Sequence, residues 1–146
     1  MSFFQSMNIS SSGLSAQRLR MNVLSANLAN AQTTRVPGEV GPYKRKDVVF
    51  SAVPAGNQFE DFLDESFGTQ LRQVKVVDVH QDQTAPRRVF DPTHPDHDKD
   101  GYVEMPNIQV MTEMVNMIAA TRAFEANTTA LNDAKQMALK ALEIGR

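Results

Sequence analysis

Apolar side chains recur at every seventh position in the last third of the chain. One row consists of Met117, Phe124, Leu131 and Ala138, and neighbouring positions of the same face hold Val110, Met114, Thr121 and Leu142. A repeat of seven is typical of a helix that packs lengthwise against other helices. Asn107, after Pro106, is suited to cap the start of such a helix, and Gly145 is suited to end it. We therefore predict one helix between these two residues.

This predicted helix is ~55 Å long, which is more than a small globular domain needs. Its opposite side carries small residues, which permit close approach of further backbones. These are Ala119, Ala120, Ala126, Ala130 and Ala141. We expect neighbouring helices on several sides of it.

A second, narrower apolar stripe lies near the start of the chain. Leu14, Met21 and Leu28 repeat at seven, with Leu24 between them, and they predict a helix from about residue 8 to about residue 31. The rest of this helix is mostly Ser, Asn, Gln and Ala, and asparagine is a mediocre helix former. Packing against other segments, rather than intrinsic propensity, must therefore stabilise it.

The middle of the chain has a different composition. All seven prolines lie between Pro37 and Pro106, and most valines lie there too, whereas most alanines lie in the flanks. Valine patterns predict strands at 43–53 and 71–82, and residues 87–90 and 101–105 read as two short strands around an Asp-rich turn. Residues 54–70 fit either a short amphipathic helix or a surface loop.

The predicted fold class is therefore α+β. Long N- and C-terminal helices, in residues 1–35 and 107–146, pair as a coiled-coil-like domain, and a small β-rich middle domain occupies residues 36–106.

Charge and cysteine content exclude several classes of function. The formal net charge is −2 and the basic residues form no stripe, which argues against nucleic acid and against an acidic membrane surface as partners. The absence of cysteine excludes disulfides and thiolate metal sites. We find no secretory signal and no apolar run long enough to span a bilayer, so we expect no membrane insertion.

Residues 94–107, HPDHDKDGYVEMPN, begin like a calcium-binding loop of the EF-hand type. Asp96, Asp98 and Asp100 alternate, and Gly101 occupies the sixth position. The twelfth position, however, is Asn107 instead of a bidentate glutamate, and no helix pattern precedes the loop. We interpret the segment as a solvated turn and expect no metal site; weak calcium binding is the alternative interpretation.

The chain also lacks the patterns of a catalytic site. It has no Gly-rich phosphate loop, no HExxH and no GxSxG. Paired carboxylates such as Asp61 and Asp64, one helical turn apart, lie on an acidic stretch that is typical of a solvated surface. We expect neither catalytic residues nor a cofactor.

Two longer stretches resemble a known family. SGLSAQRLRMNVLSANLANAQTTR, residues 12–35, resembles the N-terminal motif of bacterial flagellar axial proteins, the rod, hook and hook-associated family. PNIQVMTEMVNMIAATRAFEAN, residues 106–127, is similar to the matching C-terminal motif. Within that family the middle segments GPYKRKDVVF and DPTHPDHDKDGYVEMPN are most similar to a proximal-rod subunit.

The resemblance implies a structural subunit of the flagellar basal body. It implies export of the unfolded chain by the flagellar type III export apparatus, without a cleaved signal. It also implies assembly into a rod that spans the periplasm and transmits torque. The implied partners are proximal and distal rod proteins, the rod-to-export-gate adaptor protein, the export apparatus and further copies of the chain. The motif positions carried over are Asn27, Asn30, Asn107 and Asn127.

The apolar stripes supply the expected assembly interface. It comprises Leu14, Met21, Leu24, Leu28, Met114, Met117, Phe124, Leu131 and Leu142. We also expect the side chains of Asn27 and Asn30 to bond backbone groups where the first helix ends.

Three alternatives remain at this point. The stripes could form an ordinary intramolecular hairpin of helices, the chain could be a soluble adaptor that docks its long helix in a partner's groove, or it could be a calcium-responsive module.

Overall fold

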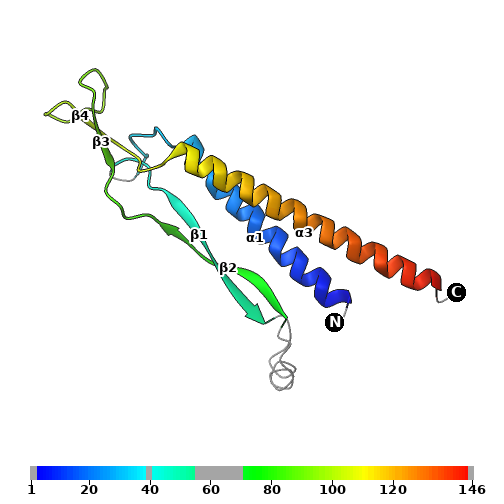
Figure 1. The fold of residues 1–146 in the computed structure, drawn as a ribbon. Helices are drawn as coiled ribbons and strands as arrows, with labels where there is room; N and C mark the ends of the chain where they lie inside the picture. Colours follow the sequence, from blue (N-terminus) through cyan, green and yellow to red (C-terminus); the bar gives the residue numbers. More distant parts are fainter. Residues whose placement is uncertain (1–2, 39–40, 55–70, 145–146) are drawn as a thin grey trace.

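The chain forms an elongated α+β structure with one long helix at each end of the sequence (Figure 1). The computed structural model describes residues 3–38, 41–54 and 71–144. Helix α1 runs from Phe3 to Ala29 and helix α3 from Val110 to Ile144. The predicted fold class is confirmed. The earlier expectation for residues 54–70 falls almost wholly outside the described residues.

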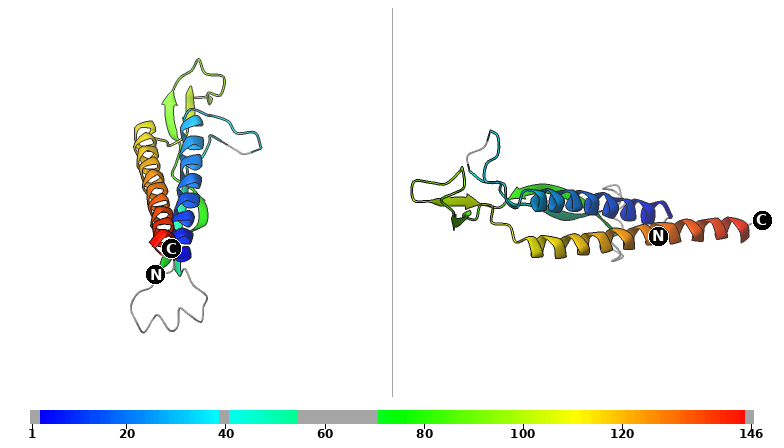
Figure 2. Two further views of the ribbon diagram at one scale, coloured as in Figure 1. Left: turned by 90° about the vertical axis from the view of Figure 1, so that its right-hand side faces the viewer. Right: turned by 90° about the horizontal axis from the view of Figure 1, so that it is seen from above.

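Helices α1 and α3 lie side by side in opposite directions, so that both chain ends are at the same end of the molecule (Figures 1 and 2). Helix α3 is 35 residues long and α1 is 27, and α3 extends past the start of α1. The described core is small and lies mainly where the two helices meet. None of the described helices combines the length and the apolar character that crossing a membrane requires.

Strands β1, Lys46–Pro54, and β2, Arg72–Gln81, form an antiparallel ribbon that runs along α1 (Figure 1). Two polar side chains of α1 hold this ribbon by its backbone. Asn27 accepts the N–H of Lys46 at 3.0 Å and donates to its carbonyl at 2.8 Å, and the Ser12 hydroxyl accepts the N–H of Val74 at 3.2 Å. The predicted strands at 43–53 and 71–82 are thus confirmed within a few residues.

Strands β3, Arg87–Phe90, and β4, Tyr102–Met105, form a separate antiparallel hairpin at the far end of the molecule from the termini. The Asp-rich segment is the loop between them, as predicted. Gly101 has φ of +79°, and a Cβ there would lie 3.0 Å from the ring of Phe90. Glycine is therefore required here by both the backbone conformation and the neighbouring ring.

The structure corrects two expectations about α3. Asn107 is not the cap, because the first helical hydrogen bond runs from the N–H of Glu113 to the carbonyl of Gln109, and the helix begins at Val110. Ala120 does not belong to the outer side with the other alanines. It is fully buried, and it lies in the same row as Glu113 and Asn127, whose side chains contact α1.

Candidate assembly interface

Two of the predicted interface residues of α1, Met21 and Leu28, lie next to α3, and the four predicted residues are buried to different depths. Leu24 is 2% exposed, whereas Leu14, Met21 and Leu28 are half-buried. The structure brings Met21 next to α3, with its sulfur 3.7 Å from the hydroxyl of Thr121. This part of the predicted stripe therefore lies at the helix pair, and most of it keeps some surface free.

The predicted residues of α3 are more exposed. Met117, Phe124 and Leu131 are half-buried, and they lie at the border of the helix pair. Met114 and Leu142 are exposed, the latter by 72%. The single chain thus covers one side of the predicted apolar row and leaves the rest uncovered.

Apart from Leu24, the centre of the helix pair is built from small and polar residues that the apolar pattern did not reveal. On α3 the row is Glu113, Ala120, Asn127 and Ala134. These positions also repeat at seven, and this spacing is the feature of the sequence that could have identified them as buried. On α1 the buried positions are Gly13, Ala16, Leu24 and Asn27. Small side chains allow the backbones to approach closely: a Cβ on Gly13 would lie 3.0 Å from the amide oxygen of Asn127.

A buried polar cluster joins α1, α3 and the start of β1. The Asn27 amide is fully buried and donates to Oε2 of Glu113 at 3.0 Å, while its oxygen accepts the Tyr43 hydroxyl at 3.2 Å. Glu113 is 1% exposed, and its other oxygen accepts Nε of Arg45 at 2.8 Å. We call Asn27, Glu113 and Arg45 the polar junction.

The charges of the polar junction are balanced. Burial by itself lowers the pKa of Arg45, but its hydrogen bonds and charge interactions with Glu113 and Asp47 outweigh this effect and raise the pKa above the ordinary value. The guanidinium therefore stays charged, and it pairs with a carboxylate that has been removed from water. A buried charge without such a partner would be strongly destabilising.

The other asparagines of the motif have separate roles in the structure. Asn30 donates to the carbonyl of Ala26, within the last turn of its own helix, as expected. Asn27 instead bonds backbone groups of β1, a different segment. Asn127 donates to the carbonyl of Ala123 within α3, and Asn107 is exposed in the segment before that helix.

An apolar face of α3 is left uncovered near its start. Its exposed members are Val110, Met111, Met114, Val115 and Ile118. Beside it, Leu28 of α1 and Met114, Met117 and Ile118 line a groove of about 440 Å³. Met137, Leu139, Leu142 and Ile144 form a second exposed group at the other end of α3. Contiguous apolar surface of this kind marks a protein interaction site.

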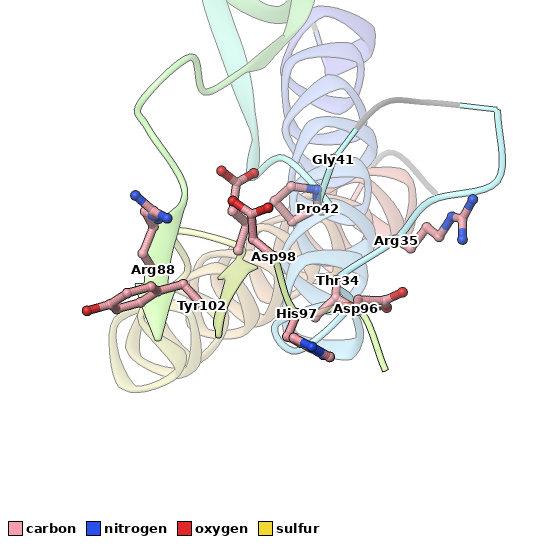
Figure 3. A pocket seen from close by; sticks show the side chains of 10 residues that line it. Thr34, Arg35, Gly41, Pro42, Arg88, Asp96, His97, Asp98 and Tyr102 are labelled. Carbon is pink, nitrogen blue, oxygen red and sulfur yellow. Dashed lines mark hydrogen bonds between the residues drawn. The ribbon is translucent and has the colours of Figure 1, made fainter. Parts of the chain in front are cut away.

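A polar cleft of about 390 Å³ lies at the end of the molecule that carries the β3–β4 hairpin, between the hairpin loop and the segment after α1 (Figure 3). Arg88 lies over the ring of Tyr102, 4.9 Å from its centre, and the Thr34 hydroxyl donates to Asp96 at 2.8 Å. Within the described residues, no three His, Asp or Glu side chains converge as metal ligands. Asp96 and Asp98 instead serve hydrogen bonds, the latter to the N–H of Lys99.

Fold and surface together define a class of protein. The chain pairs its two terminal helices, leaves part of their apolar faces uncovered, and carries a β-rich insert between them. This combination is typical of a structural subunit that packs through its helices.

Comparison with known proteins identifies the class more closely. Residues 7–35 match the family described as "Flagella basal body rod protein", and residues 99–144 match "Flagellar basal body rod FlgEFG protein C-terminal". The chain is 45% identical to the flagellar basal-body rod protein FlgC of Bacillus subtilis, with all of both chains covered. It is 42% identical to that of Borreliella burgdorferi, over 99% of this chain and 98% of the relative. It is 39% identical to that of Salmonella typhimurium, over 95% of each.

The chain therefore belongs to the FlgC family of flagellar basal-body rod proteins. It is a structural subunit of the rod in the flagellar basal body and not an enzyme, and it assembles with other flagellar components.

Proposed function

We propose that this subunit packs into the proximal rod through the apolar faces of its terminal helices, and so helps to transmit torque from the motor to the hook and filament. The observation that carries this proposal is the uncovered face of α3 around Ile118, which is 63% exposed. Burying a side chain of this size contributes about 1.5–3 kcal/mol. Several such residues on neighbouring subunits would contribute enough to hold a stiff assembly.

The distribution of these residues supports more than one neighbour. The groove beside Leu28 and the group around Leu142 lie near opposite ends of α3. Two surfaces at opposite ends suit a head-to-tail contact, in which each subunit uses different patches toward the neighbours on either side. In this proposal residues 1–35 and 107–146 form the packing domain, and residues 36–106 form the insert.

The proposed packing residues fall into two groups. Leu14, Met21, Leu28, Met117, Phe124 and Leu131 border the helix pair, and Met114 and Leu142 project from it. Leu24 belongs to the intramolecular core and supports the interface from behind.

The proposed partners are the proximal and distal rod proteins, the rod-to-export-gate adaptor protein and further copies of the chain. We further propose that the chain reaches the periplasmic rod through the flagellar type III export apparatus, without cleavage of a signal. The absence of cysteine suits a chain that moves from a reducing into an oxidising compartment.

Mass spectrometry of detergent-resistant basal bodies tests this proposal. We expect the polypeptide in these particles, in the proximal segment, with its N-terminal residues intact. If it is instead a folded monomer in the soluble fraction and missing from basal bodies, the groove beside Leu28 would be better explained as the docking site of a soluble adaptor.

A further inference from the structure

The helix pair is built on a repeat that admits more than one alignment. Asn27 faces Glu113 at 3.0 Å, and Gly13 is in close contact with Asn127. The helices are antiparallel, so a position seven residues earlier on α1 faces a position seven residues later on α3. Sliding one helix by seven residues, about 10 Å, returns each row to the same face. The small residues of the rows do not by themselves exclude this slip.

One slipped alignment is electrostatically acceptable. If α3 moves by seven residues toward the start of α1, Glu113 comes to lie opposite Arg20, and Ala120 comes opposite Gly13. An arginine would then face the carboxylate, and an alanine would replace Asn127 at the closest approach. The aligned structure must therefore contain something that favours it over this alternative.

The polar junction provides that preference. Asn27 bonds both the N–H and the carbonyl of Lys46, which fixes the neighbouring Arg45 relative to α1. Glu113 of α3 then accepts bonds from Arg45 and Asn27 together, at 2.8 and 3.0 Å, and reaches both of them in one alignment. Buried polar groups are known to select the alignment of paired helices at some cost in stability.

We propose that Glu113 is the positioning residue that sets the alignment of the helix pair. Its carboxylate bonds Arg45, which the β insert holds in a fixed place relative to α1. This inference concerns the folding of the single chain and goes beyond its role in the rod. Correct alignment also places Leu28 beside Met114 and Ile118, so that it creates the exposed groove.

Disulfide trapping in the full-length chain tests this proposal, because the sequence contains no cysteine of its own. The pair Met21→Cys with Thr121→Cys reports the observed alignment. The pair Met21→Cys with Met114→Cys reports the slip toward Arg20, and Met21→Cys with Thr128→Cys reports the opposite slip. Each slipped pair is about 10 Å out of reach in the observed alignment, which is too far for a disulfide. Cross-linked monomers are measured on non-reducing gels after mild oxidation.

In the parent chain we expect the Met21–Thr121 pair to form at least about tenfold more product than either slipped pair. Glu113→Leu should bring a slipped pair to within about twofold of it while helix content is kept. The urea midpoint of unfolding should fall, because the substitution leaves Arg45 and Asn27 without their common acceptor. Glu113→Gln, which retains an oxygen for Asn27, should preserve the alignment better. Glu143→Leu, an exposed glutamate of the same helix, should change nothing.

Arg45→Met should shift the alignment of the helix pair in one direction only. It leaves Glu113 buried without its cation, so the Met21–Met114 product should rise, because Arg20 faces the carboxylate in that slip, and the Met21–Thr128 product should not. Three results would overturn the proposal: a dominant Met21–Thr121 product in folded Glu113→Leu, loss of all helix content in that variant, or no directional change in Arg45→Met. Monomer cross-links are read separately from rod incorporation, so they do not depend on the outcome of the basal-body experiment.

Discussion

Asn27 connects more partners than any other side chain of the polar junction. Its amide bonds the backbone of Lys46 on both sides, the carboxylate of Glu113 and the hydroxyl of Tyr43. Asparagine suits this position because it combines two donors and an acceptor on a short side chain. The same residue therefore connects α1 to both β1 and α3 through hydrogen bonds.

We predict that Asn27→Ala lowers the free energy of unfolding by about 3 kcal/mol, because each polar group left buried without a partner costs about 1–3 kcal/mol. Urea unfolding followed by circular dichroism measures the change. Asn22→Ala, at an exposed position of the same helix, is the matched control and should cost little. Equal effects of the two substitutions would show that helix propensity, and not the buried bonds, is being measured.

Asp91 gives a residue-scale prediction about pH. Its Oδ1 accepts the Thr93 hydroxyl at 2.6 Å and the Thr93 N–H at 3.1 Å, and these bonds lower the pKa of Asp91 below its ordinary value of 3.8. A lowered folded pKa means that the carboxylate stabilises the loop fully above about pH 3.8. That contribution is lost as the pH falls through the lowered pKa.

Thr93→Val removes the hydroxyl, which is the largest cause of the shift, and should move the pKa of Asp91 back toward its ordinary value. A carboxyl carbon NMR titration reads this directly. Asp82, whose pKa is lowered by the equivalent bonds from Thr84, should titrate identically in both proteins. An unchanged Asp91 titration would contradict the assignment to the hydroxyl.

At the scale of elements, the distance between α1 and α3 depends on Gly13. The Cβ of any other residue would lie 3.0–3.2 Å from the Asn127 side chain, which is tighter than ordinary contact. We predict that Gly13→Val destabilises the helix pair by about 1–3 kcal/mol through overpacking. The loss is measured by thermal unfolding.

Two further variants separate overpacking from helix propensity. Asn127→Ala shortens the facing side chain, so Gly13→Val should cost clearly less in that background. Ser11→Val, at an exposed position of α1, carries the same β-branched penalty without the contact. If Gly13→Val costs no more than Ser11→Val, the close approach does not limit the packing.

Two aspartates of the β1–β2 ribbon bond backbone N–H groups of the residues that follow them. Val48 and Val79 face each other in the ribbon, yet their N–H groups bond the carboxylates of Asp47 and Asp78 instead of the opposite strand. These bonds occupy backbone donors that would otherwise be open to another strand.

At the scale of the whole molecule, stability and assembly depend on different residues. Ile118 is exposed in the single chain, so Ile118→Asp should leave the unfolding midpoint unchanged but abolish swimming, because a charge in a closed helix interface cannot be solvated. Leu24→Asp should abolish both, because Leu24 is buried within the chain. Swimming motility in soft agar and urea unfolding of the purified chain are the two measurements.

Asp98→Asn, in the exposed hairpin loop, is the control and should be nearly silent in both assays. Loss of motility there would favour the calcium interpretation of the loop. Normal swimming of Ile118→Asp would remove the main support for packing through this face of α3.

The sequence by itself determined the elements. A seven-residue repeat specifies a long helix because one face must stay apolar along its length, and valine and proline placement specifies the insert because these residues disfavour helix. The same patterns predicted the hairpin around the Asp-rich turn, since strand residues on both sides of turn residues leave few alternatives. The helix boundaries were less accurate: α1 begins five residues earlier than predicted, at Phe3.

Tertiary structure alone decided which row of each helix meets the other. Several rows of α3 repeat at seven, and apolar character favours the row of Met117, Phe124 and Leu131, yet the closest approach uses the row of Glu113, Ala120 and Asn127. Close packing selects small side chains, and a carboxylate can occupy such a row when a distant Arg45 supplies its counter-charge. That partner lies 68 residues away in the sequence, and folding alone brings it there.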